Sequence, residues 1–250
     1  MIHYHGSPFG STRQDAARFY SGRHAIISYA RQDDLGGCLD ACQSVALDNG
    51  AFSAWKSSKP LDISGYLSWL RNIGRHPAVD WALIPDVIDG EEADNAALVR
   101  QWSRERLPCQ VVPVWHLHES LDYLRWLLED WQLVALGSSG QYDTPGEPRW
   151  WGRMAEAFAV ICDEHGRPRR RLHGLRMMDP EIFRYCPFRS VDSTNAAQNC
   201  NRITRFGQYP APTAAQRGAI IADRVEAYQS PPLWGGHRFG AFELQRQDAG

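Results

Sequence analysis

Eight short apolar runs are interleaved with longer segments of helical periodicity along this chain, and this arrangement limits the folds open to it. The runs do not alternate strictly between apolar and polar residues, which is typical of parallel strands buried on both faces. They lie at residues 2–5, 25–29, 44–47, 79–84, 110–115, 133–136, 172–177 and 188–191. Eight strands separated by helices within about 230 residues predict an α/β fold, a (β/α)8 TIM barrel.

The length of 250 residues and the apolar content of 43% suit one large core, so we expect a single barrel domain over residues 1–250. A final amphipathic helix is predicted at about 213–228, followed by an irregular tail over 229–250. No apolar window is long enough to span a membrane, and residues 1–10 do not resemble a signal peptide. The six cysteines are scattered, which fits a reducing compartment. We therefore expect a soluble, cytoplasmic protein with no membrane partner.

The segment from Arg171 to Asn195 reads as a strand, a helix of about two turns that begins after Asp179, and a second strand. The second strand is expected to deliver Asp192 just past its carboxyl end, where active-site residues of parallel α/β folds lie. The alternative is that residues 192–195, DSTN, only cap the helix that follows.

Polar residues follow most of the predicted strands. They are Asp48, Asp86, His116 and His118, the glycine-rich segment 137–140, His173 on its strand, and Asp192. In a barrel these positions converge on one mouth. Several buried charges would be costly to retain there without a role. The sequence therefore predicts a catalytic or ligand-binding site at the mouth.

Several of these motifs resemble those of tRNA-guanine transglycosylases. Residues 48–52, DNGAF, are similar to the D-S-G-G-F-Q loop of that family, and Pro85-Asp86 falls where its base-reading aspartate follows a strand. Residues 136–139, LGSS, resemble its glycine pair, and residues 190–195, SVDSTN, resemble the segment with its nucleophilic aspartate. His173-Gly174 lies where the family has a methionine-glycine run. The motifs occur in the same order, over about residues 44–200.

The resemblance implies a base exchange through a covalent aspartyl-glycosyl intermediate, with Asp192 as nucleophile and Asp48 as acid and base. It implies that Asp86, Gly137 and Ser138 bind the base. It also places the loop residues Asn49 and Phe52 in the substrate site. His116 and His173 are expected to stack on or bond the base, with packed structural histidines as the alternative.

The chain departs from that family after Asp192, because the C-x-C-x-x-C zinc module is missing and Cys200 stands alone. It is most similar to the zinc-less branch of DNA 7-deazaguanine transglycosylases, the DpdA type, some of which are viral. This implies no metal, no cofactor, a queuosine-related 7-deazaguanine base, and DNA as a more favoured substrate than tRNA. A partner protein that opens the duplex is possible under this reading, in the cytoplasm of a bacterial or virus-infected bacterial cell.

Positive charge concentrates in residues 165–250, with 13 basic and 7 acidic side chains. The densest cluster is Arg167, Arg169, Arg170 and Arg171, which suits a phosphate backbone. The alternative is an ordinary solvated loop that leads into a strand.

Two other functions remain open. His3 and His5 at the end of the first strand, together with the later histidines and a final aspartate, also describe a metal-dependent amidohydrolase barrel. A non-catalytic nucleic-acid-binding paralogue would keep the barrel and use the arginine-rich part of the chain.

Overall fold

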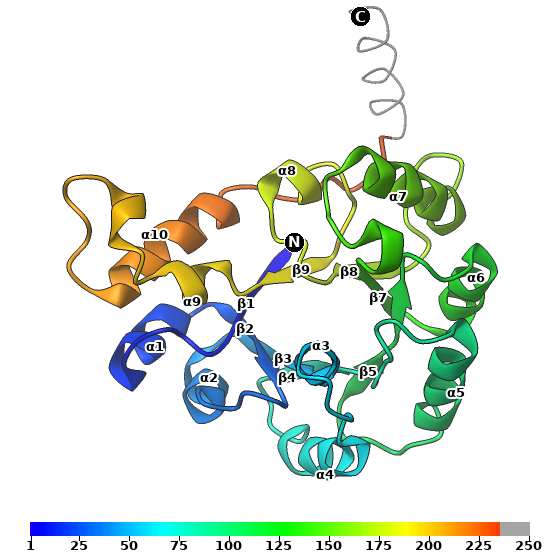
Figure 1. Cartoon of the computed structure of the whole chain (residues 1–250), viewed down its shortest axis with the longest axis horizontal. Coiled ribbons are helices and arrows are strands. Elements are labelled where there is room, and N and C mark those ends of the chain that lie inside the picture. Colours follow the sequence, from blue (N-terminus) through cyan, green and yellow to red (C-terminus); the bar gives the residue numbers. More distant parts are fainter. Residues whose placement is uncertain (236–250) are drawn as a thin grey trace, which may run out of the picture.

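The computed structural model describes residues 1–235, which form a ring of parallel strands surrounded by helices (Figure 1). The strands are β1 (Ile2–Gly6), β2 (His24–Ser28), β3 (Ser44–Asp48), β4 (Val79–Leu83), β5 (Gln110–Val112), β6 (Val114–His116), β7 (Leu133–Gly137), β8 (Arg171–Gly174) and β9 (Ser190–Ser193). Their order in the sheet is β5-β4-β3-β2-β1-β9-β8-β7-β6, and every pairing is parallel. The predicted α/β fold and its barrel architecture are confirmed.

Pro113 divides the predicted strand 110–115 into β5 and β6. β5 pairs with β4, whereas β6 pairs with β7. Pro113 therefore connects the two edge strands of the sheet. Proline has no N–H to donate to a ladder. Its carbonyl still accepts a hydrogen bond from the backbone N–H of Ala135, at 2.9 Å, which keeps the two edges together.

Helices follow nearly every strand and form the outer layer (Figure 1). They are α1 (Arg13–Tyr20), α2 (Leu35–Ala41), α3 (Ala51–Lys56), α4 (Ile63–Ile73), α5 (Glu92–Trp102), α6 (Leu121–Asp130), α7 (Pro148–Ile161), α8 (Pro180–Phe183), α9 (Asn195–Asn199) and α10 (Ala214–Glu226), with 3-10 turns η1 (Gly140–Tyr142) and η2 (Ile203–Phe206). Within residues 1–235, none of the helices has the length and apolar character that crossing a bilayer requires.

Several predicted boundaries are wrong, and the strand predicted over 188–191 runs over Ser190–Ser193. The strand predicted over 172–177 ends at Gly174, because the chain turns at Arg176, whose φ is +57°. The helix after Asp179 is a single turn. Residues 229–235 of the predicted irregular tail contain no helix or strand, and the rest of that tail lies outside the described residues.

Side chains alternate between the inside of the barrel and the helical layer. Tyr4, Ile26, Trp81 and Leu83 pack inside the barrel, and Tyr4 donates a hydrogen bond to Asp80 at 2.6 Å. Because strand residues point alternately to the two faces, the neighbours of Tyr4 point outward. His3 accordingly packs against Phe183, with its ring centroid 5.5 Å away.

Candidate active site

Three aspartates from three parts of the barrel interact at the carboxyl ends of the strands. Asp48 is the last residue of β3, Asp86 follows β4, and Asp192 is the third residue of β9. Asp48 is close enough to both other carboxylates for their negative charges to raise its pKa. The predicted convergence of these residues is therefore present. Asp192 lies inside its strand and not beyond it, with 7% of its surface exposed.

Asp192 is held through one of its two carboxylate oxygens. Its Oδ1 accepts a hydrogen bond from the backbone N–H of Arg176 at 2.8 Å and lies 3.2 Å from Nε2 of His173. The other oxygen, Oδ2, accepts no hydrogen bond from the described residues. This carboxylate is thus fixed in orientation and keeps one oxygen available to a ligand.

His173 lies beneath Asp192 and not in the open mouth. Its ring is fully buried, and Nδ1 lies 2.9 Å from the hydroxyl of Ser190. If Ser190 donates to Nδ1, then Nε2 carries the proton and donates to Asp192. The expectation that His173 stacks on a base is not supported, since the geometry makes it a residue that orients Asp192.

His116 also contacts carboxylates instead of open space. Its Nε2 lies 2.9 Å from Oδ2 of Asp86, and its Nδ1 lies 3.6 Å from Oε2 of Glu119. Burial alone would lower the pKa of His116, but the two carboxylates outweigh burial and raise it to about 9. The imidazole is therefore a cation at neutral pH, and its contact with Oδ2 holds Asp86 in place.

Glu119 and Asn95 complete this buried network, and neither was predicted from the sequence. The Glu119 side chain is fully buried; it accepts from the backbone N–H of His116 at 2.7 Å and from Nδ2 of Asn95 at 2.8 Å. Asn95 also bonds both backbone polar groups of Val87. The segment after Asp86 is thereby tied to the segment after β6. The sequence signal for this network was the position of Glu119, three residues after His116 at the end of a strand.

Asn49 supports Asp86 from the other side. Its amide nitrogen donates to Oδ1 of Asp86 and to the carbonyl of Ile84, both at 2.7 Å, and its side-chain oxygen accepts from the N–H of Ala51. All of these side-chain groups are used inside the protein. Asn49 therefore positions Asp86, and its expected contact with a substrate stays a prediction.

Asp48 is partly exposed at the mouth. Its Oδ2 accepts from the N–H of Gly50 at 3.3 Å, where a φ of +81° at Gly50 turns the chain into α3. Burial is the main cause that raises the pKa of Asp48 to about 6, and the charges of Asp86 and Asp192 add to it, although a hydrogen bond with Ser28 and the charge of Arg176 act in the opposite direction. A carboxyl group with this pKa can both donate and accept a proton near neutral pH.

Arg176 is the main site residue that the sequence reading missed. Its side chain interacts electrostatically with Asp192, Asp48 and Asp86, and its guanidinium lies 3.1 Å from the ring centroid of Phe52. Burial lowers the pKa of Arg176, while the three carboxylates raise it. One cation thus balances part of the negative charge, and Phe52, on α3, supports it at the mouth. A single arginine in the apolar run 172–178 was the signal in the sequence.

Gly137 and Ser138 lie at the end of β7, as predicted. A Cβ atom at Gly137 would lie 3.3 Å from Val114 and 3.4 Å from the ring of His116, so the strand end approaches that histidine closely. The hydroxyl of Ser138 accepts a hydrogen bond from Trp150 at 2.9 Å. Next to it, the Ser139 hydroxyl lies 2.7 Å from Nδ1 of His118.

The predicted arginine cluster lies at the opposite end of the barrel. Arg167, Arg169 and Arg170 precede β8, and Arg171 is its first residue, so they surround the amino ends of the strands. They cannot line the same mouth as the three aspartates. Arg170 is also partly structural, because it donates to the carbonyls of Leu128 and Glu129 at the end of α6.

The histidine pair of the amidohydrolase hypothesis is also outside the mouth. His5 points to the helical layer, where Nε2 lies 2.7 Å from Glu226 of α10. His3 faces Phe183, and burial is the main cause that lowers its pKa to about 4. Within residues 1–235 no group of three or more histidine, cysteine or acidic side chains is arranged to hold a metal ion. The amidohydrolase hypothesis needs His3 and His5 at the mouth, and the structure places neither of them there.

The fold and the site together define a single-domain parallel βα barrel with an aspartate-rich mouth. A scan of protein-family models gives no match to this chain, and a search of curated proteins finds no significantly similar sequence.

Proposed function

We propose that the protein is a base-exchange transglycosylase, which replaces guanine in a nucleic acid with a 7-deazaguanine base through a covalent aspartyl-glycosyl intermediate. The observation that carries this proposal is the pairing of two unlike aspartates at one mouth. Asp192 is anchored through a single oxygen, whereas Asp48 has a pKa of about 6. A nucleophile and a separate acid and base are what such an exchange requires.

In the first step a free oxygen of Asp192 attacks C1′ of the nucleoside. The bond from C1′ to the purine nitrogen breaks, its electron pair stays on the purine, and protonated Asp48 gives its proton to the departing guanine. The sugar is then held as an ester of Asp192. In the second step the incoming base gives its ring proton to Asp48 and attacks C1′, and the ester bond breaks to restore the Asp192 carboxylate.

Asp86 is suited to read the base, because His116 and Asn49 hold its carboxylate in a fixed position. A carboxylate accepts hydrogen bonds from the ring N–H and exocyclic amine of a guanine-like base. A base without those donors would leave Asp86 without these bonds, at a cost of about 1–3 kcal/mol for each one lost. Gly137 and Ser138 border the same mouth and could contact the opposite edge of the base.

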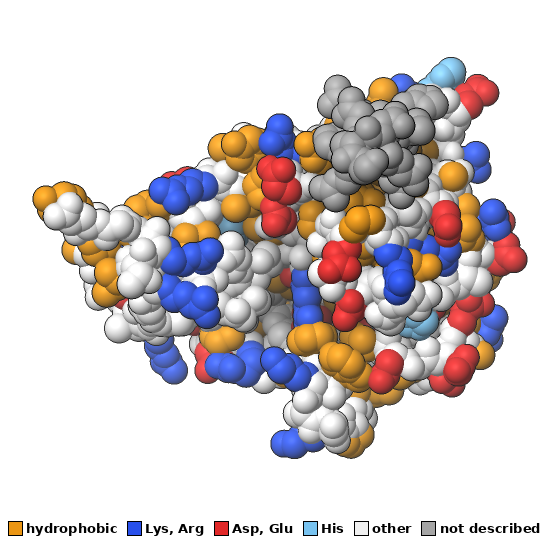
Figure 2. All heavy atoms as spheres, turned by 45° about the horizontal axis from the view of Figure 1, so that its top comes forward, with side chains coloured by type: hydrophobic (Ala, Val, Ile, Leu, Met, Phe, Trp, Pro, Cys, Tyr) orange, Lys and Arg blue, Asp and Glu red, His pale blue; other side chains and the backbone are white. Residues whose placement is uncertain are grey.

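Basic side chains on the side of the mouth support a polyanionic substrate. Figure 2, an oblique view of this side, has many lysine and arginine side chains in its left part and more acidic ones in its right part. Exposed basic residues in segments that follow the carboxyl ends of strands are Arg13, Arg31, Lys56, Lys59, Arg202 and Arg205. These residues, and not the cluster at Arg167–Arg171, are the candidates to contact the nucleic-acid backbone beside the reacting base. Because a paired base is stacked inside its helix, it must be flipped out or offered in a single strand.

The proposal is tested by incubating the protein with guanine-containing DNA or with tRNA, each with a labelled 7-deazaguanine base, and by digesting the polymer for nucleoside mass analysis. The proposal predicts a labelled nucleoside in one polymer, with DNA favoured by the similarity to the zinc-less branch. A product found only in tRNA would overturn the choice of polymer. Label in neither polymer, with duplex, single-stranded and folded substrates all tried, would overturn the proposed reaction.

A pair of charge variants tests the surface that contacts the backbone. Replacing Lys56 and Lys59 with alanine is expected to weaken binding of the polymer. It should also make the slope of log affinity against log salt concentration shallower, by the amount that corresponds to about two phosphate contacts. Replacing Arg104 and Arg106, which are exposed in the segment between α5 and β5 at the other end of the barrel, is the matched control. Equal losses from both pairs would contradict a backbone path across the mouth.

A further inference from the structure

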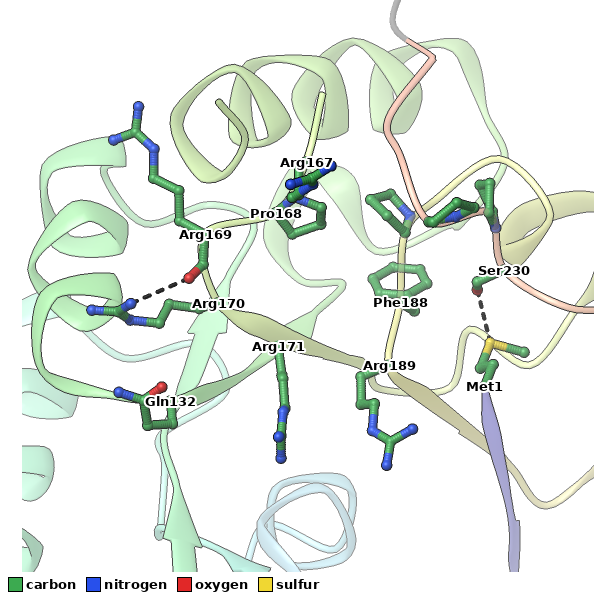
Figure 3. A pocket seen from close by; sticks show the side chains of 13 residues that line it. Met1, Gln132, Arg167, Pro168, Arg169, Arg170, Arg171, Phe188, Arg189 and Ser230 are labelled. Atoms are coloured by element: carbon green, nitrogen blue, oxygen red, sulfur yellow. Dashed lines mark hydrogen bonds between the residues drawn. The ribbon is translucent and has the colours of Figure 1, made fainter. Parts of the chain in front are cut away.

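A second cavity lies at the amino ends of the strands, away from the three aspartates. It has a volume of about 520 Å³ and is lined by the segment 167–171, by residues 187–189, by Met1 and Gln132, and by residues 230–232. Figure 3 looks into this cavity, where Arg171, the first residue of β8, and Arg189, which directly precedes β9, extend in the same direction and Phe188 lies beside them. The proposed exchange reaction makes no use of this cavity.

Its charge is unbalanced. Five arginines line the cavity, and none of its lining residues is an aspartate or glutamate. Within residues 1–235, the guanidinium groups of Arg167, Arg169, Arg171 and Arg189 form no ion pair at 4 Å or less; the nearest opposing charge that acts on one of them is that of Asp163, whose pKa Arg167 helps to lower. Arg23, by contrast, forms ion pairs with Asp223 and Glu226. A concave site with several unpaired guanidinium groups attracts anions, and phosphate matches the donor geometry of arginine best.

The backbone that carries these arginines is fixed before any ligand arrives. The N–H of Arg171 donates to Gln132, and the N–H of Arg189 donates to Leu172, at 3.1 and 2.9 Å. Arg170 anchors the segment by donating to two carbonyls at the end of α6. The frame is therefore rigid, and a bound anion would need to order only the ends of side chains.

We propose that this cavity is a binding site for phosphate groups, held by Arg167, Arg171 and Arg189. Its volume lies within the range of small-ligand sites, so a phosphorylated small molecule such as a diphosphate fits it. The same chemistry is present in the backbone of a polynucleotide. Since the cavity is at the opposite end of the barrel, this binding does not depend on the proposed transglycosylase reaction.

The test is calorimetric titration of the full chain with inorganic pyrophosphate and, separately, with a short oligothymidylate. The double variant Arg171→Ala/Arg189→Ala is expected to bind the phosphate ligand with an affinity at least tenfold lower. The matched control, Arg104→Ala/Arg106→Ala, removes the same charge from exposed positions at the same end of the barrel and is expected to change affinity less than twofold. Equal melting temperatures of the three proteins would exclude misfolding as the cause.

The two ligands distinguish the source of the phosphate. Binding of pyrophosphate that is lost in the cavity variant supports a small phosphorylated ligand, whereas binding of the oligonucleotide alone, lost in the same variant, assigns the cavity to a polymer backbone. An absence of binding by the unmodified protein, or equal losses in the cavity and control variants, would overturn the proposal. Asp192→Asn is expected to leave this binding unchanged, so failure of the proposed enzyme reaction and failure of this site give different results.

Discussion

Replacing Asp48 with asparagine is expected to make the protein more stable at alkaline pH while it abolishes base exchange. Asp48 has an ordinary pKa of 3.8 that rises to about 6 in the folded state, chiefly because of burial and then because of Asp86 and Asp192. The folded protein therefore binds this proton more tightly than the unfolded chain does. Stability from the protonated group is fully present below about pH 4 and is lost as the pH rises through about 6.

The size of the effect follows from the difference in pKa. At 1.36 kcal/mol for each pKa unit, ionised Asp48 lowers the free energy of unfolding by at most about 3 kcal/mol, and its partial exposure reduces this to about 1–2 kcal/mol. Asparagine keeps the shape and can still accept the hydrogen bond from Gly50. The free energy of unfolding of the variant should therefore exceed that of the unmodified protein by about 1–2 kcal/mol at pH 8, and the two values should converge near pH 4.

Urea denaturation followed by tryptophan fluorescence at several pH values measures this difference. Equal unfolding slopes with a midpoint that moves only above about pH 5 would be the expected pattern. A variant that is less stable at pH 8, or a difference that does not change with pH, would refute the reasoning about Asp48 and its charged neighbours.

Three further variants test the parts of the site that surround these carboxylates. Arg176→Ala removes the cation that opposes the rise in the pKa of Asp48, so the pH midpoint of base exchange should move above about 6, and an unchanged profile would contradict this role. His116→Gln leaves buried carboxylates without their cation and should lower the free energy of unfolding by about 3 kcal/mol. The unmodified protein should itself lose stability as the pH rises toward about 9, since the raised pKa of His116 means that its contribution is complete below about pH 6.5. His173→Phe keeps an aromatic ring but removes the donor to Asp192, so kcat should fall about tenfold, equivalent to a hydrogen bond of about 1.5 kcal/mol, with KM unchanged.

The barrel could be predicted from the sequence because its signal is repeated along the chain. Each strand is a short apolar run, and each is followed by a helical pattern or a turn signal. Boundaries were harder where one residue decides them. Pro113 interrupts a run that otherwise reads as one strand, and Arg176 turns the chain inside the apolar run 172–177.

The carboxylates of the site were predictable from their places at strand ends, but their supporting contacts were not. Asn49 and Asp86 are 37 residues apart in the chain, and only the neighbouring positions of β3 and β4 bring them together. The histidines were expected to face a ligand because sequence alone does not say whether a strand-end side chain is covered. The arginine cluster was assigned to the reacting polymer, whereas its position before β8 places it at the other end of the barrel.

The most direct test of the proposed reaction is the mass of the protein after incubation with guanine-containing DNA or tRNA, followed by rapid denaturation and peptide mapping. The proposed reaction predicts a nucleic-acid adduct on the peptide that contains Asp192, and neither adduct nor exchange in Asp192→Asn with an unchanged melting temperature. An adduct on a different residue, or base exchange by the Asp192→Asn protein, would contradict it.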